Sequence, residues 1–158
     1  ERIDAGQPYV ALVDYAHTPR AVAAVLADAR ALADPGARVL VVLGCGGDRD
    51  RDKRPMMGQA AAAGADLAVF TNDNPRSEDP AEILAAMQSG VAAGSRVLVE
   101  PHRGRAIEVA VGLARPGDVL VVAGKGHEQG QETAGIVVPF DDRVVLRAAI
   151  EAQLGAAS

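Results

Sequence analysis

Four short polar segments carry residue types that bind small molecules. They read DYAHTP at residues 14–19, GCGGDRD at 44–50, DNPR at 73–76 and GKGHE at 124–128. The glycines of the second segment allow a tight turn, and such turns near a helix start offer backbone N–H groups to an anion. The other three segments supply carboxylate, imidazole, amide, guanidinium and ammonium groups. Four polar segments in equivalent positions indicate a ligand site more strongly than any one of them does.

Each segment also has a purely structural explanation. Asp14 can end a strand, and His17 can be an ordinary loop histidine. The run at residues 48–54 alternates in charge, which is typical of a solvated face, and the NP pair of the third segment is common in turns. Lys125, between two glycines, can be a surface lysine. Taken singly, these segments do not decide the function.

The common nucleotide and metal motifs are missing. Lys125 is followed by Gly126, so there is no G-x-x-x-x-G-K-[ST] loop with its magnesium-binding hydroxyl, and no G-x-G-x-x-G follows the first strand. No Cys and His residues have zinc spacing. We therefore expect no metal site and no catalytic residue in this domain.

A scaffold must bring the polar segments together. Short apolar runs predict strands at residues 10–13, 39–43, 67–70, 97–99, 119–122 and 136–138. Periodicity and end signals predict helices from Pro19 to a stop at 34–36, from Pro55 to about Gly64, after a cap at Asp79, and at residues 105–114 and 142–154. This alternation predicts an α/β fold with a Rossmann-like, open and mostly parallel sheet covered by helices on both faces. Such sheets bind ligands beyond the carboxyl ends of their strands, where the polar segments lie.

Length and composition limit the partners. The 158 residues fit one domain, since domains run to about 100–200 residues. A net charge of -5 gives no basis for binding nucleic acid. No apolar run approaches the ~20 residues of a membrane span, and the single cysteine, Cys45, is compatible with a reducing compartment. We expect a cytoplasmic protein without nucleic-acid or membrane partners, in which residues 1–9 are the remnant of a hinge from a preceding domain.

The four segments, together with FDDR at residues 140–143, resemble the carboxy-terminal domain of Mur ligases. The resemblance covers nearly the whole chain and keeps five motifs in the family's order. It implies that residues 1–158 are one such domain. In the family, an amino-terminal domain holds the UDP-sugar and a central domain carries the P-loop and the Mg²⁺ site, and both domains are absent from this chain.

The resemblance further implies a role in ATP-dependent synthesis of peptidoglycan precursors. The family converts a substrate carboxylate and ATP into an acyl phosphate, which an incoming amine attacks to give an amide, ADP and phosphate. The expected partners are ATP, Mg²⁺, the UDP-muramoyl dipeptide, and the protein's own amino-terminal and central domains. We expect the isolated domain to be inactive, because it lacks the P-loop.

The DNPR segment resembles the signature of family members that add meso-diaminopimelate to UDP-N-acetylmuramoyl-L-alanyl-D-glutamate. By this resemblance, the residues expected to contact the amino acid are Arg49, Asp73, Asn74, Arg76, Gly124 and Glu128. The residues expected to face the nucleotide's ribose and base are Asp14, Tyr15 and His17. Diaminopimelate carries two ammonium and two carboxylate groups, which suits a pocket that combines arginines with carboxylates.

Two alternatives stay open. One is a lysine-adding or other Mur-type amide ligase, although Arg76 argues against lysine, which has no second carboxylate to pair with it. The other is a stand-alone small-ligand-binding module with a Rossmann-like fold, against which the missing G-x-G-x-x-G weighs.

Overall fold

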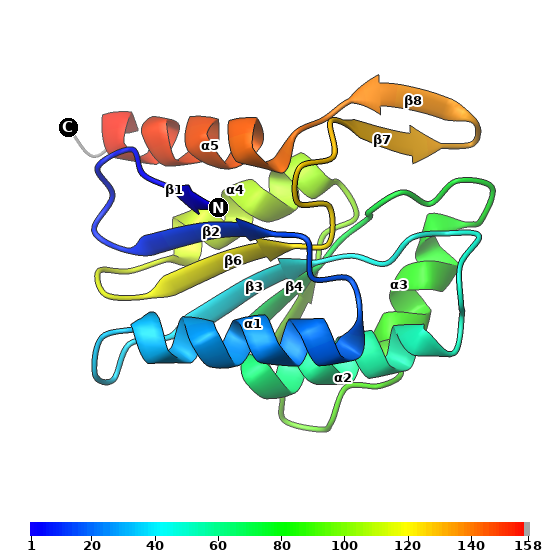
Figure 1. Ribbon diagram of the computed structural model, residues 1–158, viewed down its shortest axis with the longest axis horizontal. Coiled ribbons are helices and arrows are strands. Elements are labelled where there is room, and N and C mark those ends of the chain that lie inside the picture. The colour runs from blue at the N-terminus through cyan, green and yellow to red at the C-terminus, as the bar shows by residue number, and fades with distance from the viewer. Residues whose placement is uncertain (157–158) are drawn as a thin grey trace.

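A computed structural model describes residues 1–156, which form a six-stranded sheet with helices on both faces (Figure 1). The strands lie in the order β1-β2-β6-β3-β4-β5. Their bounds are β1 Arg2–Ile3, β2 Val10–Asp14, β3 Val39–Leu43, β4 Leu67–Phe70, β5 Val97–Val99 and β6 Val119–Ala123. All neighbours are parallel except β1, which pairs antiparallel with β2. The expected α/β fold with a mostly parallel sheet is confirmed.

Strand β6 lies between β2 and β3, although it follows β5 in the chain. Its residues pair with both neighbours over the full strand, with Val121 opposite Leu12 on one side and Val41 on the other. Every residue of β3 and β6 is buried, as expected for central strands covered on two faces. This order brings the carboxyl ends of β2, β6, β3 and β4 side by side.

Five helices cover the sheet within the described part of the chain. They are α1 Pro19–Leu32, α2 Lys53–Gly64, α3 Pro80–Gln88, α4 Arg103–Leu113 and α5 Asp142–Ala156. Helices α1, α2 and α3 share one apolar core with the sheet, whereas α4 and α5 share the core on the opposite face (Figure 1). The cores consist mainly of Val, Leu, Ile and Ala, which agrees with the low aromatic content. No helix within residues 1–156 is both long enough and apolar enough to cross a bilayer.

Two predicted helix starts are confirmed in detail. The Thr18 hydroxyl accepts a hydrogen bond from the Ala21 amide at 3.2 Å, and the Asp79 carboxylate accepts one from the Ala81 amide at 2.8 Å. Each cap is followed by a proline at the first helical position, where a missing N–H costs nothing. Two other helices begin two residues earlier than expected, α2 at Lys53 and α4 at Arg103.

The strand predicted at residues 136–138 is not part of the main sheet. Strand β8 (Ile136–Pro139) instead pairs antiparallel with β7 (Gly130–Thr133) in a separate hairpin. The two-residue turn at Ala134 and Gly135 has positive φ angles of 51° and 76°, the backbone that tight hairpins favour. All of β8 is exposed, so its apolar run does not mark a core strand.

Residues 1–9, for which the sequence predicted no element, contain an edge strand. Besides the two pairs of β1 with β2, the Val13 amide donates to the Glu1 carbonyl at 2.8 Å. Ile3 and Tyr9 are buried in the core beneath α4 and α5. A two-residue strand has too little periodicity to be recognised in a sequence.

Candidate functional site

The four polar segments meet at the carboxyl edge of the sheet, around a pocket of ≈ 300 Å³. The lining residues come from the loops after β2, β3, β4 and β6 and from the first turns of α2: Tyr15, His17, Gly44, Cys45, Gly46, Arg49, Asp50, Lys53, Arg54, Met57, Asp73, Asn74, Arg76, Gly124 and Glu128. The predicted segments therefore contribute to one site.

Eight of the nine residues expected to contact ligands line this pocket, and Asp14 does not. The Asp14 carboxylate accepts a hydrogen bond from the Ala16 amide at 2.8 Å, so it shapes the turn after β2. The same turn brings Tyr15 and His17 to the pocket. The expected contact of Asp14 with the nucleotide's ribose stays a prediction.

The glycines after β3 allow two loops to pack backbone against backbone. A Cβ atom on Gly47 would lie 1.8 Å from the Pro75 carbonyl oxygen, and one on Gly44 would lie 2.4 Å from that of Thr71. The Gly47 amide also donates to the Asn74 carbonyl at 2.8 Å. Glycine is required here because the loop after β3 lies directly on the loop after β4.

Asn74 is the centre of a buried polar network. Its side-chain oxygen accepts hydrogen bonds from the Lys125 ammonium at 3.1 Å and the Glu132 amide at 2.9 Å. Its side-chain nitrogen donates to Glu128 at 3.0 Å. Lys125 also donates to Glu128 at 3.2 Å and lies 4.0 Å from Asp73. The network ties the loop after β4 to the loop after β6.

Burial and charge act in opposite directions on the two carboxylates of this network. Burial raises the pKa of Asp73 above its ordinary value, although Arg103 and Lys125 act to lower it. Burial also acts to raise the pKa of Glu128, but hydrogen bonds from Lys125 and Asn74 outweigh it and lower the pKa. Glu128 is therefore held ionised at the edge of the pocket, suited to pairing with an ammonium group.

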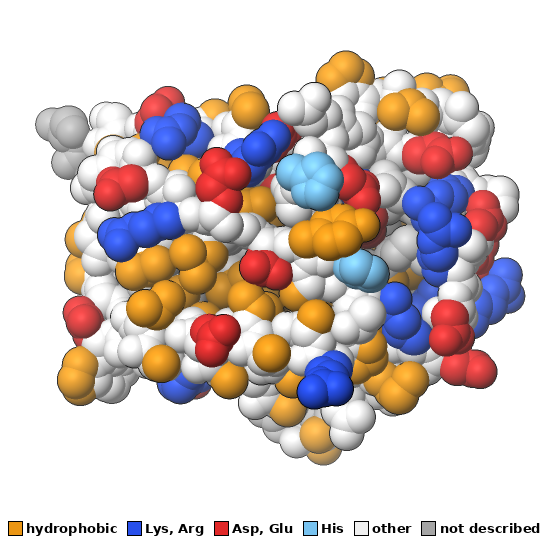
Figure 2. All heavy atoms as spheres, in the orientation of Figure 1, with side chains coloured by type: hydrophobic (Ala, Val, Ile, Leu, Met, Phe, Trp, Pro, Cys, Tyr) orange, Lys and Arg blue, Asp and Glu red, His pale blue; other side chains and the backbone are white. Residues whose placement is uncertain are grey.

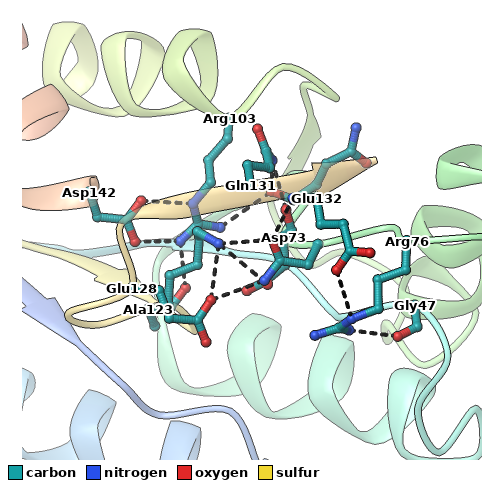
Figure 3. A network of polar contacts seen from close by, with 12 residues as sticks. Gly47, Asp73, Arg76, Arg103, Ala123, Glu128, Gln131, Glu132 and Asp142 are labelled. Atoms are coloured by element: carbon teal, nitrogen blue, oxygen red, sulfur yellow. Dashed lines mark hydrogen bonds and ion pairs between the residues drawn. The ribbon is translucent and has the colours of Figure 1, made fainter. Parts of the chain in front are cut away.

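A fully buried ion pair lies behind the network (Figure 3). Arg103 donates to both oxygens of Asp142, at 2.8 and 2.7 Å, and so joins the first residues of α4 and α5. The same guanidinium donates to the carbonyls of Ala123 at 3.1 Å and Asn72 at 3.4 Å. These carbonyls directly precede Gly124 and Asp73, so Arg103 fixes the points from which two pocket loops leave the sheet.

Arg76 connects the pocket to the hairpin. Its guanidinium donates to the Gly47 carbonyl at 2.7 Å and lies 3.5 Å from the Glu132 carboxylate (Figure 3). Its backbone amide donates to the Glu132 carbonyl, and its own carbonyl accepts from Ala134. The φ angle of Arg76 is 53°, which is strained for any residue other than glycine. Strained backbone of this kind is often found at functional positions. Among the described residues, the ion-pair partner of Arg76 is Glu132 and not the neighbouring Glu78 or Asp79.

The charged run after β3 is only partly a solvated face. Residues 48–52 are exposed, as that interpretation predicted, and Arg49 makes a hydrogen bond with the neighbouring Asp48 carbonyl at 3.4 Å. Arg54, by contrast, is buried and donates to both oxygens of Glu78, at 3.0 and 2.7 Å. The run therefore anchors α2 to the loop after β4 and leaves Arg49 directed to the pocket.

An aromatic group lies at the loop after β2, where Tyr15 and His17 line the pocket. The exposed Tyr15 ring lies 4.6 Å from the His17 ring and 5.6 Å from the His127 ring, measured between centroids. Figure 2 shows histidine side chains gathered beside an exposed hydrophobic side chain on this face. Planar rings can stack on such a surface, and the expected contact of Tyr15 and His17 with the nucleotide stays a prediction.

Several site residues escaped the sequence analysis. Lys125 is buried and not a surface lysine, because two carboxylates and an amide surround its ammonium group. Arg54 and Lys53 line the pocket, and their adjacency to the glycine loop was a usable signal. Arg103 carried no signal, and Asp142 lies in the FDDR motif but its partner could not be foreseen, since the pairing of the two spans 39 residues.

Within residues 1–156, no group of three or more His, Cys, Asp or Glu side chains is arranged to hold a metal ion. We therefore derive no step through Mg²⁺ from these residues.

Comparisons with known proteins agree with this geometry. Residues 1–126 match the family described as Mur ligase, glutamate ligase domain. A protein from Streptomyces avermitilis is 56% identical over 160 residues, with 98% of this chain and 31% of that protein covered. One from Geobacillus thermodenitrificans is 53% identical over 152 residues, covering 96% and 31%. Both are named UDP-N-acetylmuramoyl-L-alanyl-D-glutamate–2,6-diaminopimelate ligase.

A solved structure bearing the same name superposes with a TM-score of 0.91 at 44% identity, over 98% of this chain and 31% of that one. The chain thus spans about a third of the length of these relatives. Matching sequence motifs, fold and family extent lead to one conclusion: the chain belongs to the Mur ligase family.

Proposed function

We propose that this chain is the carboxy-terminal domain of a ligase that adds meso-diaminopimelate to UDP-N-acetylmuramoyl-L-alanyl-D-glutamate. One observation carries the proposal: Arg49 and Arg76 line the same pocket as the carboxylates of Asp73 and Glu128. A zwitterionic amino acid with two ammonium and two carboxylate groups needs such a combination. The relatives of that name support the choice of substrate.

The chain's own residues bind and orient the reactants. Arg49 and Arg76 pair with substrate carboxylates, and Glu128 accepts hydrogen bonds from an ammonium group. Tyr15 and His17 offer a surface to the nucleotide base at the opposite side of the pocket. The amine that attacks is thereby held beside the nucleotide, and restricting two reactants to one geometry accounts for a large part of the rate enhancement in bond-forming enzymes.

ATP and Mg²⁺ bind mainly outside this chain, in the remaining length of the protein. Bound Mg²⁺ would neutralise phosphate charge during acyl phosphate formation. The UDP-muramoyl dipeptide would bind to the preceding domains, and closure of this domain over them would exclude water from the acyl phosphate. ATP and UDP-linked precursors are cytoplasmic compounds, which supports a cytoplasmic location.

The test is ADP release by the full-length protein with each amino acid in turn. We expect release that requires both the UDP-dipeptide and meso-diaminopimelate, with lysine a poor substitute. Efficient use of lysine would favour the lysine-adding alternative, and no ligation with any amino acid would favour a binding module. Residues 1–158 alone should melt cooperatively and release no amino-acid-dependent phosphate.

A further inference from the structure

The buried ammonium group of Lys125 has no role in the reaction described above. Lys125 lies two residues after the end of β6, and its side chain is fully shielded from solvent. A buried ammonium without partners is costly, but this one contacts Asn74 at 3.1 Å and Glu128 at 3.2 Å, with Asp73 at 4.0 Å. Lys125 thus touches three of the residues expected to contact the amino acid, without lining the pocket itself.

The contacts of Lys125 determine what Asn74 offers a ligand. The two lone pairs of the Asn74 side-chain oxygen accept from Lys125 and from the Glu132 amide. The side-chain nitrogen donates one hydrogen to Glu128 and keeps a second. Asn74 can therefore only donate toward the pocket, which suits a substrate carboxylate and rejects an ammonium group.

The same contacts determine what Glu128 offers. Within residues 1–156, the hydrogen bonds to its carboxylate from Asn74 and Lys125 both go to Oε2. The side chain is 37% exposed and lines the pocket, which leaves Oε1 to accept a hydrogen bond from a substrate ammonium group. The buried Lys125 ammonium group thus orients the Asn74 amide as a donor beside the Glu128 carboxylate as an acceptor.

We propose that Lys125 is a positioning residue that fixes which groups of the amino-acid subsite donate and which accept hydrogen bonds. Asn74 then donates to a substrate carboxylate, and Glu128 accepts from a substrate ammonium group. The proposal rests on the proposed function and extends it to a residue that does not touch the substrate.

The charges around Glu128 make the proposal visible in a pH profile. Lys125, Arg76 and Arg103 face it as cations, and Asp73 faces it as an anion. Despite burial, Lys125 and Asn74 lower the pKa of Glu128, so the carboxylate stays ionised to a lower pH. Without Lys125 this pKa rises, and the acceptor for the ammonium group is lost at a higher pH.

The experiment uses the full-length ligase with Lys125→Met. We expect KM for meso-diaminopimelate to rise about tenfold or more, because charge-assisted hydrogen bonds are the stronger ones. KM for ATP should change little, and the acid limb of kcat/KM for diaminopimelate should move to higher pH. A loss of packing alone would lower the melting temperature without moving that limb.

Arg38→Met is the matched control. Arg38 pairs with Asp118 at 2.6 Å just before β3 and β6, at the sheet edge opposite the pocket. This variant should lose stability but keep the wild-type KM and pH limb. If Lys125→Met shows the same behaviour as Arg38→Met, the positioning role is overturned.

A second variant decides the question if Lys125→Met does not fold. Lys125→Arg keeps the positive charge but places its donors differently, so we expect a raised KM for diaminopimelate and an unshifted acid limb. An unchanged KM in this variant would overturn the proposal. Absence of diaminopimelate-dependent ADP release by the wild-type ligase would overturn the proposed function instead, whatever the variants do.

Discussion

The ion pair between Arg103 and Asp142 gives a prediction about stability that does not depend on the function. Both side chains are fully buried and joined by two hydrogen bonds of 2.8 and 2.7 Å. Asp142→Ala removes the partner of a guanidinium that cannot reach water. Breaking a buried pair in this way costs about 3–5 kcal/mol. For a domain of this size, each kcal/mol lowers Tm by about 2–4 °C, so the loss should be about 6–20 °C.

The measurement is denaturant and thermal unfolding of residues 1–158, with Arg30→Met as the control. Arg30 pairs with Asp66 at 2.6 Å, but both side chains are about half exposed, at 45% and 42%. An exposed pair contributes about 0–1 kcal/mol, so the control should stay close to wild type. A loss below about 1 kcal/mol in Asp142→Ala would refute the reasoning, because Arg103 would then have found another partner or water.

A double variant separates charge from packing at this position. Arg103→Met with Asp142→Leu removes both charges and retains apolar volume, and such replacements can restore stability. We expect it to be more stable than Asp142→Ala. It should still fall short of wild type, because Arg103 also binds the carbonyls of Ala123 and Asn72. A double variant as unstable as Asp142→Ala would show that packing, and not the unpaired charge, causes the loss.

Three further predictions follow from the site. Arg76→Ala in the full-length ligase should lower kcat/KM for diaminopimelate by about 10–100-fold, which corresponds to the loss of one hydrogen bond to a charged group. The poor activity with lysine should stay unchanged, and equal losses for both amino acids would contradict this. His17→Ala should raise KM for ATP by roughly 2–10-fold, as for one neutral hydrogen bond, and more than KM for diaminopimelate; an unaltered KM for ATP would count against the nucleotide assignment. Hydrogen bonds from Arg54 and the Asp48 amide lower the pKa of Glu78 from 4.5 to about 2, so its stabilising effect is complete above pH 4.5 and is lost as the pH falls toward 2. Unfolding curves of wild type and Glu78→Gln should therefore converge over that range, and a constant difference between them would argue against this pairing.

The sequence was a good guide to the parallel sheet and its loops. Runs such as Val39–Leu43 and Val119–Ala123 are buried on both faces, and that demand leaves a continuous apolar signal. The polar segments follow those strands directly, so locating the strands also located the pocket. The nine expected contact residues came from the family resemblance, and eight of them line one pocket.

What escaped prediction depends on which segments pack against one another. Ile136–Pro139 looks like a core strand because its composition is apolar, yet its partner is the adjacent polar Gly130–Thr133 and its surface is exposed. Lys125 looks like a surface residue because the groups that compensate its charge come partly from a loop 51 residues away. Local composition reports propensity, whereas the burial of a charge is decided by whichever segment packs against it.

The position of β6 between β2 and β3 has a consequence for the order of assembly. Val119 of β6 pairs with Val10 of β2 and with Val39 of β3. The strand that joins β2 to the rest of the sheet is therefore separated from both partners by long stretches of chain. Contacts between such distant segments form slowly, because the entropy of closing the intervening loop is lost first. During synthesis, β3, β4 and β5 can associate before β6 leaves the ribosome. The loops after β2 and β6 cannot yet meet the loops after β3 and β4, so the pocket is not formed. Ligand binding should therefore appear in one late step of folding, and a growing chain should gain no protection from substrate until then.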